Sequence, residues 1–323
     1  MQSFLHDHRE QLSRRGFHFC ASMGQRNNRQ LAQAMMRAWR SDDFFQQRRM
    51  TDIRVRKAWR RSVMASFEQE VASVSPDHHT FLISSEHFHS RLAKRGEIRM
   101  LVQCLTPHFD ELEVVCYLRR QDRMAISLYS TVLKAGHQVA SMLPMDDSLP
   151  RTRYYFDYER LLNRWADASG HASIQPRIYD AAEQLPGGVV QDFLGHIGAT
   201  LDAPEKRVRR ENRSLSAEAQ AVLAWANSEL EARASAEARE LRRQLIRRLQ
   251  KLAPGEPALP PRGEVLEFMR YYDDSNRRCA QRWFDRESLF EAVYTEYPQD
   301  GYSGDADRIA ELIRECKPLL ESR

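Results

Sequence analysis

The sequence lacks the features that define membrane-spanning and disulfide-stabilised proteins. No apolar run in the 323 residues approaches the length of about 18 residues that a membrane-spanning helix needs, and no signal peptide opens the chain. The five cysteines are scattered, and no two of them form a Cys-x-x-Cys pair. We therefore expect reduced thiols in a soluble, cytoplasmic protein.

The sequence also contains neither internal repeats nor a large excess of one charge. Lys and Arg number 49 against 45 Asp and Glu, which gives a formal net charge of +4 and a pI near 8.8. This mild basicity suits an anionic small-molecule ligand, whereas a dedicated nucleic-acid-binding protein carries a larger excess. With 42% hydrophobic residues, the chain can bury a sizeable core.

The most informative stretch is the segment 112–130, LEVVCYLRRQDRMAISLYS. It begins with an uninterrupted apolar run, residues 114–118, which is typical of a strand covered on both faces in a parallel sheet. Three arginines follow, and apolar residues then recur at helical spacing (Arg119, Arg120, Arg123; Met124, Leu128, Val132). Ligands of open α/β sheets bind outside the carboxyl ends of the strands, where a helix N-terminus offers free N–H groups. The segment therefore predicts a phosphate site.

The spacing of Arg119 and Ser127, eight residues apart, resembles the 3′-phosphate-binding motif of sulfotransferases. Enzymes of this family use 3′-phosphoadenosine 5′-phosphosulfate (PAPS) as sulfonate donor, and an arginine and a serine at this spacing share its 3′-phosphate. Arginine offers a planar fork of donors and serine a short one, which suits a phosphate. The alternative is an ordinary basic turn that binds no ligand.

A second predicted strand, TFLISSE at 80–86, ends in Glu86. Related sulfotransferases have a catalytic Glu or His near this point, so the resemblance implies that Glu86 takes the proton of the acceptor hydroxyl. Two alternatives remain: Glu86 caps the following helix, or His87 or His89 is the base. A metal site is not expected here, because His87 and His89 are poorly spaced for one ion on a helix and no third ligand follows.

Two further segments resemble nucleotide-binding parts of the family. Tyr179 ends the predicted edge strand 174–180, at the position where the family has a tyrosine beside the adenine; packing in the core is the alternative. The basic segment 206–215 ends in Asn-Arg-Ser-Leu, and the resemblance implies that Asn212 and Ser214 close over the 3′-phosphate and adenine.

The resemblance implies an α/β fold of the P-loop type, with a parallel sheet flanked by helices and a helical C-terminal part. We expect a sulfotransferase-like core at 1–205, a basic loop and helical excursion at 206–263, and C-terminal helices at 264–323 that pack back on the core. In the family, a strand and a Gly-, Lys- and Thr-rich loop that holds the 5′-phosphosulfate precede the first helix. This sequence begins just past that loop, so a gap in the sheet is expected.

Three functional hypotheses follow. The first is transfer of a sulfonate from PAPS to a hydroxyl acceptor, such as that of a carbohydrate. The second is an inactive protein that retains 3′-phosphoadenosine binding for interaction or sensing. The third, in which the basic segment 206–250 binds nucleic acid or an acidic partner, is the least favoured because its basic residues alternate with acidic ones.

Overall fold

The computed structural model describes residues 1–145, 154–170, 172–201, 215–230 and 236–321, and the chain divides into two compact units. Unit 1 comprises residues 1–118 and 158–209, and unit 2 comprises residues 119–157 and 210–323. We predicted that residues 119–157 belong to a core at 1–205. In the structure they group with residues 210–323 instead. Among the described helices, none combines the length and the apolar character needed to span a bilayer.

Unit 1 contains two parallel pairs of strands. β1 (Phe17–Phe19) pairs with β2 (Thr80–Leu82), and β3 (Glu113–Leu118) pairs with β4 (Ser173–Ile178). The expected α/β class with parallel strands is confirmed. The sequence predicted one sheet, however, and the described residues form two separate sheets of two strands each.

Strand β3 differs from its prediction in burial. Its apolar run was expected to be covered on both faces, but only Leu118 is fully buried, and residues 114–117 are half-buried. Part of this exposure comes from the narrow sheet, since a strand of a two-stranded sheet has one unpaired edge that adds to the accessible surface of its residues. Pro176 of β4 lies opposite Cys116, in keeping with the edge position that proline requires.

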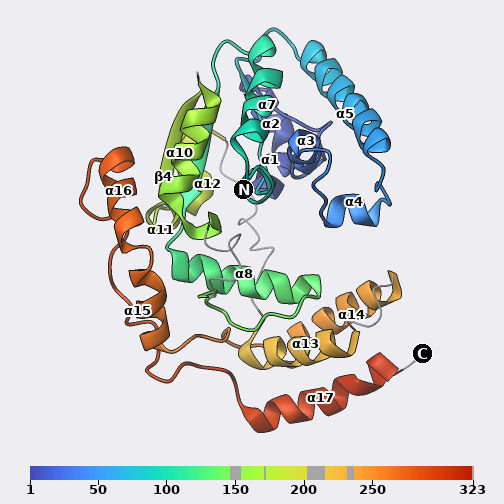
Figure 1. Ribbon diagram of the computed structural model, residues 1–323, viewed down its shortest axis with the longest axis vertical. Helices are drawn as coiled ribbons and strands as arrows, with labels where there is room; N and C mark the ends of the chain where they lie inside the picture. The colour runs from blue at the N-terminus through green and yellow to red at the C-terminus, as the bar shows by residue number, and fades with distance from the viewer. Residues whose placement is uncertain (146–153, 171, 202–214, 231–235, 322–323) are drawn as a thin grey trace. The chain divides into compact units, whose positions relative to one another are not determined.

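Helices make up most of the rest of unit 1 (Figure 1). Asp42 and Asp52 start two of them, because their carboxylates accept the free N–H groups of Phe44 (3.1 Å) and Arg54 (2.6 Å). The elements are α1 (Gln2–Asp7), α2 (Arg9–Ser13), α3 (Arg29–Met35), α4 (Asp43–Gln47), α5 (Ile53–Ser73), α6 (His87–Arg91), α7 (Arg95–Leu105), the 3₁₀ turn η1 (Thr106–His108), α10 (Tyr158–Ser169), α11 (Tyr179–Glu183) and α12 (Gly188–His196).

Helix α12 contacts both strand pairs. Val190 belongs to the apolar cluster that contains Phe17 of β1. Asp192 accepts hydrogen bonds from the hydroxyl of Tyr117 in β3 (2.6 Å) and from Nη2 of Arg177 in β4 (2.7 Å). The two sheets are thus connected through side chains of one helix, and the hydrogen bond and charge of Arg177 lower the pKa of Asp192.

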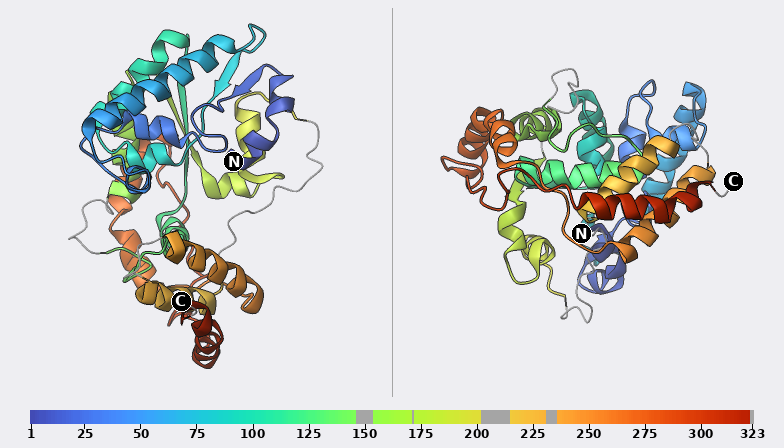
Figure 2. Two further views of the ribbon diagram at one scale, coloured as in Figure 1. Left: turned by 90° about the vertical axis from the view of Figure 1, so that its right-hand side faces the viewer. Right: turned by 90° about the horizontal axis from the view of Figure 1, so that it is seen from below.

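Unit 2 is helical in all its described elements. They are α8 (Gln121–Ala135), α13 (Ala217–Leu230), α14 (Ala236–Leu252), α15 (Arg262–Arg270), α16 (Asp273–Phe284) and α17 (Ala306–Glu321). Leu133 of α8 packs into a cluster with apolar residues of α13, α14 and α17, which lie side by side in Figure 2. A second cluster joins Phe156 and Tyr297 to α8 and α15.

Candidate functional site

The predicted strand, basic turn and helix are present. β3 ends at Leu118, Arg119 follows it directly, Arg120 is the N-cap, and α8 begins at Gln121. The boundary between the two units falls between Leu118 and Arg119. Ser127 lies in the second turn of α8 and is half-buried, as is Arg119. Both residues belong to unit 2, and Thr131 Oγ1 donates a hydrogen bond to the backbone carbonyl of Ser127 (3.0 Å).

The arginines of this turn have different surroundings. The Arg120 side chain is only 5% exposed, and its guanidinium binds the fully buried carboxylate of Asp122 through Nε (2.8 Å) and Nη2 (2.8 Å). Burial lowers the pKa of Arg120, but the hydrogen bonds and charge of Asp122 outweigh this effect and raise it. Tyr297 Oη donates to the same carboxylate (2.7 Å). Arg120 therefore fastens the 293–297 segment to α8 and is not a ligand-binding group.

A buried pair of amides supports the start of α8. Gln121 Nε2 donates to Asn276 Oδ1 (2.6 Å), and Asn276 Nδ2 donates back to Gln121 Oε1 (3.2 Å). Gln121 Nε2 also lies 3.2 Å from the carbonyl of Phe156. Asn276 belongs to α16. Its contact was not predictable, because 155 residues separate it from Gln121.

Glu86 lies just after β2, at the N-cap position of α6. Its side chain makes no capping hydrogen bond, so the alternative that it caps this helix is wrong. The carboxylate is 57% exposed, and it accepts hydrogen bonds from Gln2 Nε2 (3.1 Å) and Asn27 Nδ2 (3.3 Å). Two neutral amides thus orient an accessible carboxylate in the loop after β2, which ends at Leu82 and not at Glu86 as predicted.

Asn28 fixes the loops on which Glu86 and Asn27 stand. It is fully buried, its Nδ2 donates to the carbonyl of Cys20 after β1 (2.8 Å), and its Oδ1 accepts from Ser84 N after β2 (2.7 Å). The Asn28 N–H also donates to the Ser84 carbonyl (3.0 Å). Sequence reasoning missed this residue, although an Asn-Asn pair before a helix is a signal for turn or cap chemistry.

His87 lies beside the carboxylate of Glu86 and is largely buried. His87 Nε2 lies 3.3 Å from Glu86 Oε1, and its side chain is 13% exposed. Burial disfavours the imidazolium and lowers the pKa of His87, and although the carboxylate of Glu86 opposes this shift, Arg29 and Arg91 add to it. Across the described ranges, no group of three or more His, Cys, Asp or Glu side chains is arranged to hold a metal ion.

The remaining predicted residues are distributed as follows. Tyr179 is the first residue of α11, directly after β4, and is half-buried in unit 1. Glu86 also belongs to unit 1, whereas Arg119 and Ser127 belong to unit 2. Asn212 and Ser214 lie outside the residues that the structure describes.

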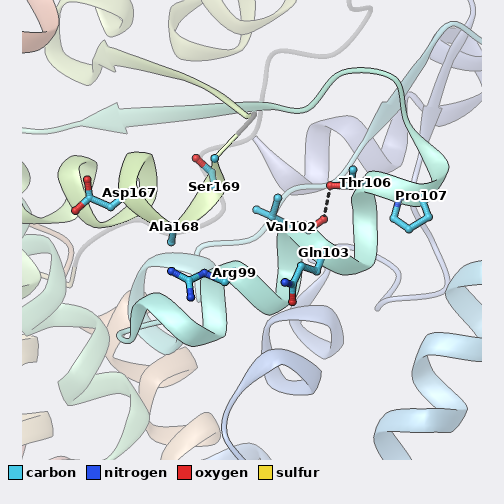
Figure 3. Close-up of a pocket in the computed structure, with 9 residues that line it drawn as sticks. Arg99, Val102, Gln103, Thr106, Pro107, Asp167, Ala168 and Ser169 are labelled. Atoms are coloured by element: carbon cyan, nitrogen blue, oxygen red, sulfur yellow. Dashed lines mark hydrogen bonds between the residues drawn. The ribbon is translucent and has the colours of Figure 1, made fainter.

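A surface pocket in unit 1 lies between α7, η1 and the end of α10 (Figure 3). Val102 and Ala168 supply apolar contacts, while Arg99 and Asp167 add charge of both signs. Asp167 also pairs with Arg95 (2.5 Å). None of the predicted site residues lines this pocket, so it is distinct from the candidate site.

Comparisons with known proteins add one relative. The chain is 30% identical over 185 residues to an uncharacterized protein of Archaeoglobus fulgidus, in a match that covers 55% of this chain and 47% of that protein. The chain thus spans about half the length of this relative. No protein-family model matches the chain, and no solved structure matches it.

Proposed function

We propose that the chain is a sulfotransferase-like protein that binds PAPS and transfers its sulfonate to a hydroxyl acceptor, such as that of a carbohydrate. The observation that carries this proposal is the succession of β3, a basic turn and α8, with Arg119 directly after the strand and Ser127 in the second helical turn. When bound, PAPS supplies the sulfonate group and leaves as adenosine 3′,5′-bisphosphate.

The residues of this turn suit a phosphate group. Arg119 offers a fork of N–H donors and Ser127 a hydroxyl donor, and the first turn of α8 contributes the positive end of the helix dipole. Arg119, which follows the strand directly and precedes Ser127 by eight residues, is the arginine assigned to the ligand. The aromatic ring of Tyr179 is the proposed contact for the adenine.

Glu86 is the proposed base. Its exposed carboxylate would accept the proton of the acceptor hydroxyl as the oxygen attacks sulfur, while the bond between sulfur and the bridging phosphate oxygen breaks. Gln2 and Asn27 donate hydrogen bonds to the carboxylate, which orients it.

A second candidate is binding of 3′-phosphoadenosine nucleotides without turnover. One feature favours it: the residues assigned to the nucleotide, Arg119, Ser127 and Tyr179, concern its 3′-phosphate and adenine, and none is assigned to the 5′-phosphosulfate. The two candidates differ in what they predict for sulfonate transfer but agree on nucleotide binding.

Titration calorimetry tests both candidates through the 3′-phosphate. The wild-type chain should bind adenosine 3′,5′-bisphosphate about 10 to 100 times more tightly than adenosine 5′-monophosphate, since a hydrogen bond to a charged group contributes about 1.5–3 kcal/mol. Arg119→Ala should abolish this preference. Arg123→Ala, which removes a cation paired with Glu296 from the same turn, is the matched control and should retain it. Equal affinity of the wild type for the two nucleotides would refute the proposed site.

A further inference from the structure

The most strongly charged part of unit 1 is the stretch 37–61. It holds nine Arg and Lys residues against three Asp, a net charge of +6, whereas the whole chain carries +4. The stretch covers the loop after α3, helix α4 and the first turns of α5. Helix α5 lies on the opposite side of unit 1 from α10 and β4 (Figure 1).

The acidic residues of this stretch are already bound within unit 1. Asp42 pairs with Arg91 (2.6 Å), and Asp43 pairs with Arg29 (2.8 Å), both of which lie outside the stretch. Asp52 caps the start of α5. The three carboxylates therefore leave most of the positive charge of the stretch uncompensated.

Of the nine basic residues, one is buried (Arg56), two are half-buried (Arg40, Arg60) and six are exposed. Arg40 binds the buried Glu97 (2.5 Å), and the buried Arg56 donates to the carbonyls of Ala38 (2.8 Å) and Met50 (2.7 Å). Six others are exposed and, in the described part of the chain, make no ion pair with a carboxylate (Arg37, Arg48, Arg49, Arg54, Lys57, Arg61).

Large apolar side chains are exposed among these cations. Trp39 is 68% exposed, Ile53 46% and Val55 50%. The Arg37 guanidinium lies 5.1 Å from the centre of the Trp39 ring. Through its bonds to Ala38 and Met50, the buried Arg56 holds the loop that carries Trp39 against the start of α5. The apolar residues are thus displayed by a fixed loop and a helix end.

We propose that residues 37–61 form a surface that binds an anionic lipid membrane from one side. Arg54, Lys57 and Arg61 are spaced at i, i+3 and i+7, which aligns them along one side of α5 toward anionic headgroups. Tryptophan favours the interface between headgroups and acyl chains, and exposed Ile and Val side chains gain by leaving water there. A nucleic acid would engage the cations and the Trp39 ring but would leave the two aliphatic side chains in water.

Sedimentation with lipid vesicles tests this proposal on the full chain. The protein should bind vesicles of phosphatidylcholine with about one third phosphatidylserine and should not bind vesicles of phosphatidylcholine alone. Each Lys or Arg near such a surface contributes about 1 kcal/mol, or about fivefold in the partition coefficient. The double variant Arg54→Gln, Lys57→Gln should therefore bind about 25-fold more weakly. A control with equal charge loss, Arg270→Gln with Arg314→Gln, removes two exposed cations of α15 and α17 and should bind like the wild type.

The apolar contact has its own readout. Quenching of tryptophan fluorescence by brominated lipids should be present in the wild type and largely lost in Trp39→Ser. No binding to the anionic vesicles at low salt, or equal binding by the two double variants, would overturn the proposal. Tight binding of a single-stranded oligonucleotide, without binding to the vesicles, would also overturn the proposal. Calorimetry with adenosine 3′,5′-bisphosphate is independent of these outcomes.

Discussion

At the scale of single residues, Glu70 of α5 shows how one carboxylate stabilises a loop. Its oxygens accept hydrogen bonds from the N–H groups of Ala21 (2.8 Å) and Ser22 (2.9 Å), from the Ser22 hydroxyl, and from His18 Nε2 (2.9 Å). Burial alone raises the pKa of Glu70, but these hydrogen bonds outweigh it and lower the pKa to about 2.

This shift predicts a pH-dependent stability. Because the pKa of Glu70 is lower in the folded chain than its ordinary 4.5, its contribution is complete above pH 4.5 and is lost as the pH falls toward about 2. Glu70→Gln should reduce the free energy of unfolding at pH 7 by about 2–3 kcal/mol. Urea unfolding at pH 7, 5 and 3 measures this. The difference between wild type and variant should shrink at pH 3, and a difference that stays constant with pH would contradict the assignment.

Glu86 carries the prediction for turnover. Glu86→Gln should leave the affinity for adenosine 3′,5′-bisphosphate unchanged and lower the rate of sulfonate transfer by about 10²–10⁴-fold, since the variant cannot take up the acceptor proton. Release of adenosine 3′,5′-bisphosphate from PAPS, measured with a panel of hydroxyl acceptors, reports the rate. The exposed Glu10→Gln serves as control. An unchanged rate in an active protein would move the role to His87.

Residue roles were only partly accessible from the sequence. The positions of Arg119 and Ser127 relative to the strand and helix follow from spacing along the chain, because short-range spacing survives folding. The bond between Arg120 and Asp122 was equally local, yet it was missed because adjacent arginines look alike in a sequence. Asn28 acquires its role through Cys20 and Ser84, which only the pairing of β1 with β2 brings together.

At the scale of elements, the end of α8 depends on α13 and α14. Gly136 terminates the helix with φ at 95°, a left-handed conformation that other residues rarely adopt. Asn227 Nδ2 donates to the carbonyl of Leu133 (2.9 Å), and Arg242 Nε donates to Asn227 Oδ1 (2.9 Å). The guanidinium of the buried Arg242 lies against Gly136, in the space that a Cβ atom at this position would occupy.

Substituting this glycine should destabilise unit 2. In Gly136→Ala, the new methyl group would adopt a disfavoured backbone conformation and overlap the Arg242 guanidinium, so we expect a loss of about 1–3 kcal/mol. Denaturant unfolding followed by circular dichroism measures it. Gly263→Ala is the matched control, because nothing lies within 4 Å of the added carbon, and it should change stability little. If both variants lost the same free energy of unfolding, neither the left-handed backbone at Gly136 nor its closeness to Arg242 would require a glycine.

The elements themselves were predicted with uneven success. The segment 114–118 was expected as a strand and β3 spans Glu113–Leu118, because a β-branched apolar run followed by arginines has few alternatives. At the start of the chain, two short helices, α1 and α2, meet at His8. The pairing of the strands could not be deduced from the sequence. Paired strands are far apart along the chain, and the pattern of residues within one segment does not show which other segment it pairs with.

At the scale of the whole molecule, the cysteines support the expectation of free thiols. All five lie in the described ranges and none forms a disulfide there, and Cys20, Cys279 and Cys316 are buried. Burial raises the pKa of Cys316, and burial together with the charge of Glu70 raises that of Cys20. A thiol that is both shielded and protonated reacts slowly.

A thiol titration tests this directly. In the native chain at pH 8, the half-buried Cys104 is the candidate for reaction with a disulfide reagent. Cys116, whose pKa burial raises to about 12, and the three buried thiols should react only after unfolding in guanidinium chloride. Addition of a reductant should leave the melting temperature unchanged. Rapid reaction of all five thiols in the native protein, or a drop in melting temperature on reduction, would contradict this description.

The two strand pairs of unit 1 share no ladder in the described residues, so side-chain contacts hold them together, and the nine-residue helix α12 supplies some of these contacts. A shear of one pair against the other would break the contacts of α12 with Tyr117 and Arg177 and leave every backbone hydrogen bond within each pair intact. Side-chain contacts are short-ranged and give way in small steps, whereas ladders break cooperatively. Unit 1 therefore contains two strand pairs that backbone hydrogen bonds hold rigid, joined by side-chain contacts that allow small relative motion. The residues of α12 that contact Tyr117 and Arg177 resist that motion.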